Sequence, residues 1–173
     1  MANDPVLPHL NAAGEVHMVS VSAKDETLRK ARAQGRLRAP GFVCQAVRDG
    51  AVDKGDVLAV ARVAAIMAAK RTAEWIPLCH PIPLTAVEVL IEIEDQGFLV
   101  VVETETRSAT GVEMEAITAV TAGLLTLYDM LKAQYRGLIV DDVHLVEKTG
   151  GKTGDYVFRD FRTETYGGYF NKQ

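Results

Sequence analysis

The sequence predicts an α+β fold, a ferredoxin-like layer of mostly antiparallel sheet with helices packed on one face. Residues 84–106 contain two segments of alternating polarity around a Gln-Gly turn, which predicts a β-hairpin. The stretches 57–75 and 111–133 on either side of it have helical periodicity. Short β-branched segments lie nearer both ends, so strands bracket helices, an order typical of a layered α+β domain.

The length of 173 residues fits one domain that buries a core without metals or disulfides. We expect that domain at 1–158 and a C-terminal tail at 159–173. Hydrophobic residues make up 48% and charged residues 24%, which is ordinary for a globular protein. The net charge of −4 argues against a general nucleic-acid-binding protein, which would normally be basic.

Neither a membrane span nor a secretion signal is visible in the sequence. No run approaches roughly 18 uninterrupted apolar residues, and no basic region followed by an apolar stretch opens the chain. Two cysteines, Cys44 and Cys79, are too few for a disulfide framework. We therefore expect a cytoplasmic protein with no membrane partner.

The N-terminal part begins with a polar arm to about residue 15, and 17–22 is β-branched enough to predict a short strand. The stretch 25–39 is ambiguous. Its Ala and Arg residues favour helix, but Gly35 interrupts the pattern and no apolar face emerges. A turn at Pro40-Gly41 and a short helix at 42–47 follow.

The remaining elements have clearer patterns. Asp56 is a candidate cap for the helix 57–75, which ends before Pro77. In 84–94 valines and isoleucines alternate mainly with glutamates, and 98–106 returns from the turn. The stretch 111–133 is predicted to be one helix, and 138–146 the last strand.

The loop Pro77-Leu78-Cys79-His80-Pro81-Ile82-Pro83 has three prolines in seven residues, which stiffen it. It is either a rigid turn with a buried Cys79 or a functional loop that positions His80. A Cys-His nucleophilic pair is disfavoured because adjacent residues in an extended chain point to opposite sides. The four histidines and two cysteines show no zinc-ligand spacing, so we predict no metal site.

Acidic side chains mark both ends of the predicted helix 111–133. Glu113 and Glu115 in its first turn are favoured by the helix dipole, which is sufficient reason for their presence. Asp129 lies in an apolar run, three residues before Lys132. That pair is either an exposed ion pair or an acid–base pair with shifted pKa values at a pocket.

Two segments are candidates for anion binding. Residues 148–154 do not form a Walker A loop, because Val146 stands where the motif needs glycine and no helix follows. The segment is either a solvated turn or a glycine loop whose lysines and backbone N–H groups meet phosphates. Lys54 lies just before the helix that Asp56 caps, where an anion would be favoured.

The segments PLCHP at 77–81, TGVEMEA at 110–116 and GGK at 150–152 occur in one order along the chain. Further matching segments lie between 11 and 154, such as KGDV at 54–57 and AAKRT at 68–72. In these segments the chain resembles the cyclic pyranopterin monophosphate synthase (MoaC) family of molybdenum cofactor biosynthesis. Ser20 stands where the family often has Asp, and Ala65 where it often has Gly. The resemblance also implies that 24–38 is mainly strand.

The resemblance implies a lyase that rearranges a cyclic dihydroguanosine triphosphate into cyclic pyranopterin monophosphate and releases diphosphate. An upstream radical GTP cyclase would supply this small-molecule substrate, and no cofactor is expected. The implied substrate-binding residues are Leu78, Cys79, His80, Glu113, Met114 and Glu115, with Arg29, Lys148 and Lys152 at the phosphates. The implied proton-transfer residues are Lys54, Asp129 and Lys132.

The spacing of the two acidic positions bears on assembly. Glu115 and Asp129 are 14 residues apart on one predicted helix, which separates them by roughly 21 Å at 1.5 Å per residue. One reacting centre cannot touch both, so if both serve one site a second subunit must supply one of them. The resemblance agrees and implies a homohexamer, a trimer of dimers with sites at the dimer interface. The alternative function is a non-catalytic oligomer that binds nucleotide phosphates.

Overall fold

The computed structural model describes residues 9–11, 13–152 and 154–160. The elements in chain order are β1 (Thr27–Arg38), α1 (Gly41–Arg48), α2 (Val57–Lys70), α3 (Thr72–Trp75), β2 (Ala86–Glu94), β3 (Gly97–Ser108), α4 (Glu113–Leu131), β4 (Ile139–Thr149) and β5 (Tyr156–Val157). The sheet has the order β2-β3-β1-β4-β5, and every neighbouring pair is antiparallel.

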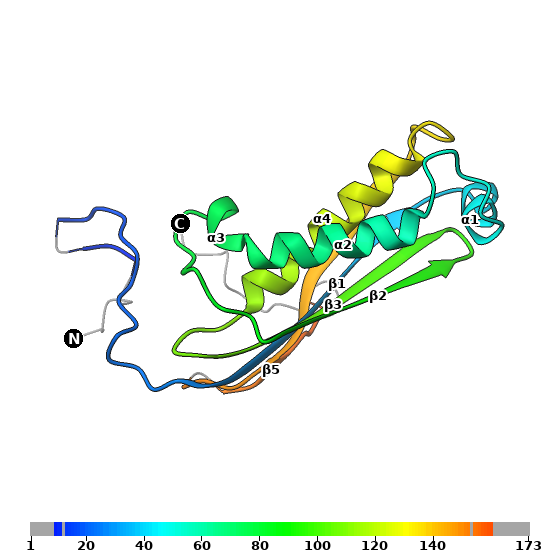
Figure 1. Ribbon diagram of the computed structural model, residues 1–173. Helices are drawn as coiled ribbons and strands as arrows, with labels where there is room; N and C mark the ends of the chain where they lie inside the picture. Colours follow the sequence, from blue (N-terminus) through cyan, green and yellow to red (C-terminus); the bar gives the residue numbers. More distant parts are fainter. Residues whose placement is uncertain (1–8, 12, 153, 161–173) are drawn as a thin grey trace, which may run out of the picture.

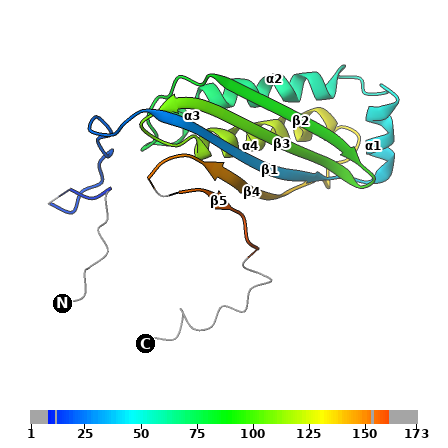
Figure 2. The same ribbon diagram turned by 90° about the horizontal axis from the view of Figure 1, so that it is seen from below.

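The arrangement confirms the predicted α+β fold with helices on one face of the sheet. Leaving out β5, the chain order is β-α-β-β-α-β with β3 and β1 in the centre, which is the ferredoxin-like arrangement. Helices α2 and α4 lie side by side across the sheet, with α1 and α3 at its two ends (Figures 1 and 2).

The stretch 25–39, whose sequence pattern was ambiguous, contains strand β1. Ala31, Ala33 and Leu37 are at most 1% exposed and face the helices. The residues between them are charged or polar and face away from the helices, so the segment alternates with the period of a strand. Helix propensity of Ala and Arg is a weak preference, and the pairing with β3 on one side and β4 on the other overrides it.

Four of the five basic residues of β1 have acidic partners on other strands of the sheet. Lys30 Nζ lies 2.7 Å from a Glu105 carboxylate oxygen, and Arg32 lies 2.7 Å from Glu147. Four such basic positions of β1, at Lys30, Arg32, Arg36 and Arg38, form ion pairs across the sheet. Cross-strand pairs of opposite charge stabilise a sheet modestly, and here they also specify the order in which the strands pair.

The two long helices follow the sequence prediction closely. The Asp56 side chain accepts a hydrogen bond from the Ala59 backbone N–H at 2.9 Å, which confirms the predicted cap of α2. The predicted helix 57–75 is interrupted at Arg71, so that α3 is a separate turn. Thr72 accounts for the break in part, because its buried hydroxyl donates to the carbonyls of Ala68 and Ala69.

Helix α4 is the centre of the core. Leu124, Leu127 and Leu131 are fully buried, and the helix packs on α2, β1, β3 and β4. By length and composition it could cross a membrane, yet most of its residues are buried inside the domain. Gly35 of β1 lets it approach the sheet, since a Cβ at that position would lie 2.8 Å from a Leu124 methyl carbon.

Two N- and C-terminal features differ from the sequence prediction. Residues 17–22 belong to no strand, because no strand of the described part of the chain pairs with them. The short strand β5 was not predicted; it pairs with the end of β4. Most of the predicted tail at 159–173 lies outside the described residues.

We expect Gly35→Val to destabilise the protein by about 1–3 kcal/mol, because a new side chain would be forced into the packed contact between β1 and α4. The matched control is Gln34→Val, the same side chain on the other face of β1, which should change stability by about 0.5 kcal/mol or less. Urea unfolding midpoints measure both. Equal midpoints for the two variants would contradict this account of the β1–α4 contact.

Candidate active site

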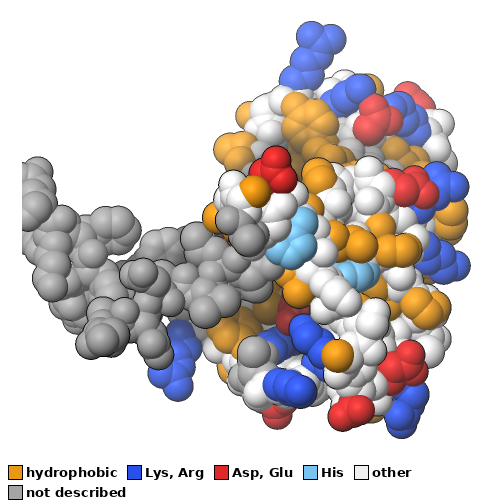
Figure 3. Space-filling view, turned by 90° about the vertical axis from the view of Figure 1, so that its left-hand side faces the viewer, with side chains coloured by type: hydrophobic (Ala, Val, Ile, Leu, Met, Phe, Trp, Pro, Cys, Tyr) orange, Lys and Arg blue, Asp and Glu red, His pale blue; other side chains and the backbone are white. Residues whose placement is uncertain are grey.

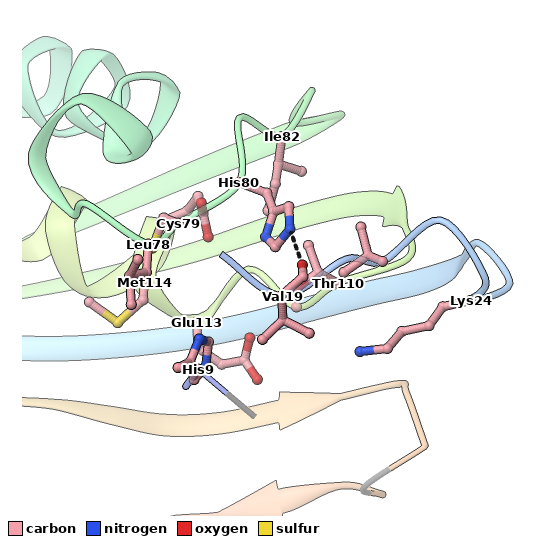
Figure 4. A pocket seen from close by; sticks show the side chains of 13 residues that line it. His9, Val19, Lys24, Leu78, Cys79, His80, Ile82, Thr110, Glu113 and Met114 are labelled. Carbon is pink, nitrogen blue, oxygen red and sulfur yellow. Dashed lines mark hydrogen bonds between the residues drawn. The ribbon is translucent and has the colours of Figure 1, made fainter. Parts of the chain in front are cut away.

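The start of α4, the loop after α3 and the N-terminal segment of residues 9–11 and 13–24, from here on called the arm, enclose a cavity of about 300 Å³, here called the loop cavity. Figure 3 faces this end of the molecule, and Figure 4 shows the cavity from close by. Its lining residues are His9, Val19, Val21, Lys24, Leu78, Cys79, His80, Ile82, Thr110, Gly111, Glu113, Met114 and Glu115. The structure thus brings together the six residues implied for substrate binding from two separate motifs.

The proline-rich loop positions His80 from both directions. The Cys79 backbone N–H donates to the Ile76 carbonyl at 3.0 Å, which anchors the loop to the end of α3. The Thr106 hydroxyl donates to the Pro83 carbonyl at 2.7 Å, which anchors it to β3. Between these anchors, His80 Nε2 contacts the Val19 carbonyl at 2.9 Å (Figure 4). The loop is therefore a rigid turn, and it holds His80 at the wall of the loop cavity.

Glu115 is an acidic side chain in a mostly apolar wall. The residue is only 3% exposed. Burial raises the pKa of its carboxyl group to about 7, because the charged form loses its hydration and Glu113 adds a second negative charge. The N–H groups at the start of α4 counteract this only in part. Burial also raises the pKa of the Cys79 thiol, and the neighbouring Glu115 charge adds to that effect.

A second, larger cavity of about 580 Å³ adjoins the loop cavity and is here called the glycine-loop cavity. The two share Lys24, Thr110, Gly111 and Glu113 in their walls. The basic residues that line the glycine-loop cavity are Lys24, Arg29, Lys148 and Lys152. One continuous hollow thus offers a partly apolar compartment beside a basic one.

The glycines of this second cavity are needed for close approach. At Gly151, where φ is +92°, a Cβ would collide with the Arg29 guanidinium group. At Gly150, where φ is +86°, it would lie 2.3 Å from the Leu28 carbonyl oxygen. Arg29 Nε also donates to the Ser108 carbonyl at 3.3 Å, and Lys148 lies 3.9 Å from Glu113. The glycine loop therefore packs against β1. Arg29 of β1, together with Lys148 and Lys152, lines the glycine-loop cavity.

The opposite end of α4 carries a cluster of three charged side chains, here called the lysine–aspartate triad. Lys54 Nζ lies 2.9 Å from one Asp129 carboxylate oxygen, and Lys132 Nζ lies 2.6 Å from the other. Lys54 also donates to the Asp129 backbone carbonyl at 2.8 Å. Hydrogen bonds from Lys132 and Lys54 hold the pKa of Asp129 down to about 2, so this carboxylate is ionised at neutral pH.

The triad is open to solvent in the single chain. The Lys54, Asp129 and Lys132 side chains are 42%, 58% and 52% exposed. A groove of about 410 Å³ between α2 and α4 runs up to Asp129, lined by apolar side chains that include Met67, Trp75 and Leu125. Met67, Trp75 and Leu125 are all large hydrophobic residues with substantial exposure. The triad therefore lies beside an apolar surface that none of the described residues covers.

The structure separates the expected site residues into two groups. Glu115 lies in the loop cavity at the start of α4, and Asp129 lies at its other end, 14 residues further on. The continuous helix confirms the predicted separation of roughly 21 Å. No lining residue of the loop cavity or the glycine-loop cavity belongs to the triad.

Sequence reasoning missed the arm. His9, Val19 and Val21 line the loop cavity. The polar composition up to about residue 15 suggested only a loose extension, and 17–22 was predicted to be a short strand with no place in the site. The alternation of half-buried Val19 and Val21 with exposed Met18, Ser20 and Ser22 is the signal that could have placed it. Within 9–11, 13–152 and 154–160, no three His, Cys, Asp or Glu side chains lie close enough together to hold a metal ion.

Comparison with known proteins gives two findings. Residues 18–151 match the model of the MoaC family. The chain is 55% identical over 152 residues to a cyclic pyranopterin monophosphate synthase of Thermomicrobium roseum, an alignment that covers 87% of this chain and 92% of the relative. The matched range includes the loop after α3, the start of α4, the triad and Gly150-Gly151.

The Glu115 pKa predicts a pH dependence of stability. Because the pKa is about 7 in the folded chain and near 4.5 in the unfolded chain, the folded state holds an extra proton between these values. This group therefore lowers the free energy of unfolding as pH rises from about 4.5 to about 7. We expect Glu115→Gln to gain stability relative to the unchanged chain across that window.

Urea unfolding of both chains at about pH 5, 6, 7 and 8 measures this difference. The advantage of the variant should grow up to about pH 7 and then level off. A difference that is constant over the whole range would show that Glu115 keeps an ordinary pKa. Glu92→Gln, at an exposed acidic position of β2 outside the loop cavity, is the matched control.

Proposed function

The chain belongs to the MoaC family, and from this we propose that it is a cyclic pyranopterin monophosphate synthase, a lyase of molybdenum cofactor biosynthesis. The proposed reaction converts a cyclic dihydroguanosine triphosphate to cyclic pyranopterin monophosphate and releases diphosphate. One structural observation supports the proposal in addition to the family match. The residues expected for proton transfer, which lie up to 78 positions apart, meet within hydrogen-bond distance at Asp129.

The two adjoining cavities suit the two halves of such a nucleotide. The loop cavity would take the guanine-derived heterocycle, with Leu78, Cys79, His80, Glu113, Met114 and Glu115 as the proposed contacts. The basic glycine-loop cavity would take the triphosphate, with Arg29, Lys148 and Lys152 as the proposed cations. Guanidinium and ammonium groups are the usual partners of phosphate oxygens.

The triad supplies groups for moving protons. Asp129 has a pKa of about 2, so it is a weak base and serves first as the carboxylate that orients two ammonium groups. Lys54 and Lys132 are then the proposed proton donors for the ring opening and closure of the substrate. When either lysine gives up its proton, Asp129 loses a neighbouring positive charge and becomes a better acceptor.

We propose that the complete site forms between two chains. In one chain a single heterocycle cannot touch both the loop cavity and the triad, because α4 holds them roughly 21 Å apart. A two-fold partner that covers the apolar groove between α2 and α4 would bring its own loop cavity to the exposed triad. The proposed assembly is a homohexamer, a trimer of dimers with sites at the dimer interface.

The setting of the reaction follows from the same chemistry. A radical GTP cyclase upstream would supply the cyclic nucleotide, and cytoplasmic GTP would be its source. We therefore place the enzyme in the cytoplasm, where both are present. The substrate is a small molecule, and no nucleic-acid partner is proposed, in keeping with the net charge of −4.

A coupled reaction tests the proposed function. GTP is incubated with the upstream radical cyclase, and the purified chain is then added. We expect the cyclic nucleotide to disappear with one diphosphate released for each cyclic pyranopterin monophosphate formed. If the chain only binds the nucleotide, its melting temperature would be higher with the cyclic nucleotide than without it, but no diphosphate would be released. That result would favour the alternative, a non-catalytic nucleotide-phosphate-binding oligomer.

We expect Lys54→Ala to lose nearly all turnover while keeping its fold. Lys54 is exposed and has no apolar role, so its melting temperature should stay close to that of the unchanged chain. The matched control is Asp53→Ala, which removes an exposed charge from the same turn outside the triad. A folded Lys54→Ala chain with a near-normal rate would remove Lys54 from the proposed machinery.

Mixing two inactive variants tests whether the site is shared between chains. Glu115→Gln and Asp129→Asn chains, each inactive alone, should regain activity when mixed and reassembled. With random pairing, a site receives Glu115 and Asp129 intact in about a quarter of cases in a two-fold assembly. Mass spectrometry confirms that subunits exchange. Activity that stays at the level of the single variants would show that each site is built within one chain.

A further inference from the structure

The N-terminal arm has a contact with the loop cavity that the proposed reaction does not yet use. Val19 and Val21 are half-buried, whereas Met18, Ser20 and Ser22 between and beside them are exposed. The arm therefore runs past the cavity as an extended segment with every second side chain turned inward. At its end the Lys24 N–H donates to the Val21 carbonyl, and the chain turns toward β1.

The contact between the arm and His80 fixes which ring nitrogen carries a proton. His80 Nε2 lies 2.9 Å from the Val19 carbonyl oxygen, and a carbonyl oxygen can only accept a hydrogen bond. Nε2 must therefore be the donor, and in the neutral ring Nδ1 is left with a lone pair. Figure 4 shows the bond to Val19 on one side of the ring and the second nitrogen on the other.

The Nδ1 atom is available for a ligand. Among the described residues, no hydrogen-bond partner is recorded for it. His80 and Glu115 both line the loop cavity and also a neighbouring hollow of about 310 Å³ next to α3. The His80 ring thus lies between two cavities, and its Nε2 atom contacts the arm at the Val19 carbonyl.

We infer that the Val19 backbone carbonyl is a positioning group of the active site, which keeps the proton on Nε2 of His80 so that Nδ1 accepts a hydrogen bond from an N–H group of the substrate heterocycle. This inference rests on the proposed function. A guanine-derived ring carries N–H donors on the edge where an adenine-derived ring carries an acceptor nitrogen. The arm thereby favours the guanine type, because the corresponding ring nitrogen of the adenine type carries a lone pair and cannot donate to Nδ1.

Nitrogen NMR of the free enzyme tests the proton position directly. The chain is labelled with ¹⁵N-histidine, and the His80 signals are those that disappear in His80→Gln. We expect the shifts of a ring protonated on Nε2 with an unprotonated Nδ1. The opposite pattern, with the proton on Nδ1, would overturn the inference. This measurement needs no turnover, so it stands even if the proposed reaction fails.

An ester in place of the Val19–Ser20 peptide bond weakens the acceptor while leaving every side chain in place. Within residues 9–11, 13–152 and 154–160, the Ser20 N–H that this change removes has no hydrogen-bond partner. An ester at the next bond, Ser20–Val21, is the matched control, because it weakens a carbonyl that His80 does not contact. Both chains are made with the corresponding α-hydroxy acid.

We expect the first ester to move His80 protonation toward Nδ1 and to lower kcat/KM by roughly three- to tenfold, in line with the modest net effect of one hydrogen bond. The control ester should change neither. An unchanged His80 spectrum in the first ester, or equal effects in both, would overturn the positioning role of Val19. If the His80 signals behave as expected but the unchanged chain shows no turnover, only the proposed function would be contradicted.

Discussion

The packing of α4 along the sheet fixes the distance between the two acidic positions of the proposed site, Glu115 and Asp129. The helix is held by fully buried Leu124, Leu127 and Leu131, and Gly35 lets it approach β1 closely. A helix packed in this way acts as a rigid spacer of about 1.5 Å per residue. Its first turn supplies Glu115 to the loop cavity, and its last turns supply Asp129 to the triad. The groups proposed for binding and for proton transfer therefore lie at the two ends of one helix.

This division explains the contrast between the two ends in charge and burial. At the first end Glu115 is buried with a pKa of about 7, because little compensates its lost hydration. At the other end Asp129 is exposed with a pKa of about 2, because two ammonium groups surround it. The ordinary pKa values of the two carboxyl groups, 4.5 and 3.8, are close, so most of the difference between them comes from their environments. Such pairs are typical of sites where acid and base roles are divided.

Much of the fold could be predicted from the sequence because its patterns are local. The hairpin at Gln96-Gly97 and the cap at Asp56 depend on residues next to each other, and both are confirmed. The strand β1 could not be told from helix by propensity, since its partners on β3 and β4 are distant in sequence. The predicted strand at 17–22 was wrong for the converse reason, as its composition suits a strand but no partner strand exists in the described chain.

In the site, too, contacts between residues close in sequence could be predicted and contacts between distant residues could not. The Asp129–Lys132 contact is local and could be predicted from helical spacing, whereas the Lys54 contact joins positions 75 residues apart. The roles themselves came from resemblance rather than from spacing. The arm's place at His80 had no local signal beyond two alternating valines.

The most direct test of a site shared between chains is a crystal structure of the assembled Lys54→Ala protein with the cyclic nucleotide bound. The account predicts a heterocycle that contacts His80 and Glu115 of one chain and lies beside Asp129 and Lys132 of another. A nucleotide whose contacts all come from one chain, or one that lies far from every Asp129, would contradict it.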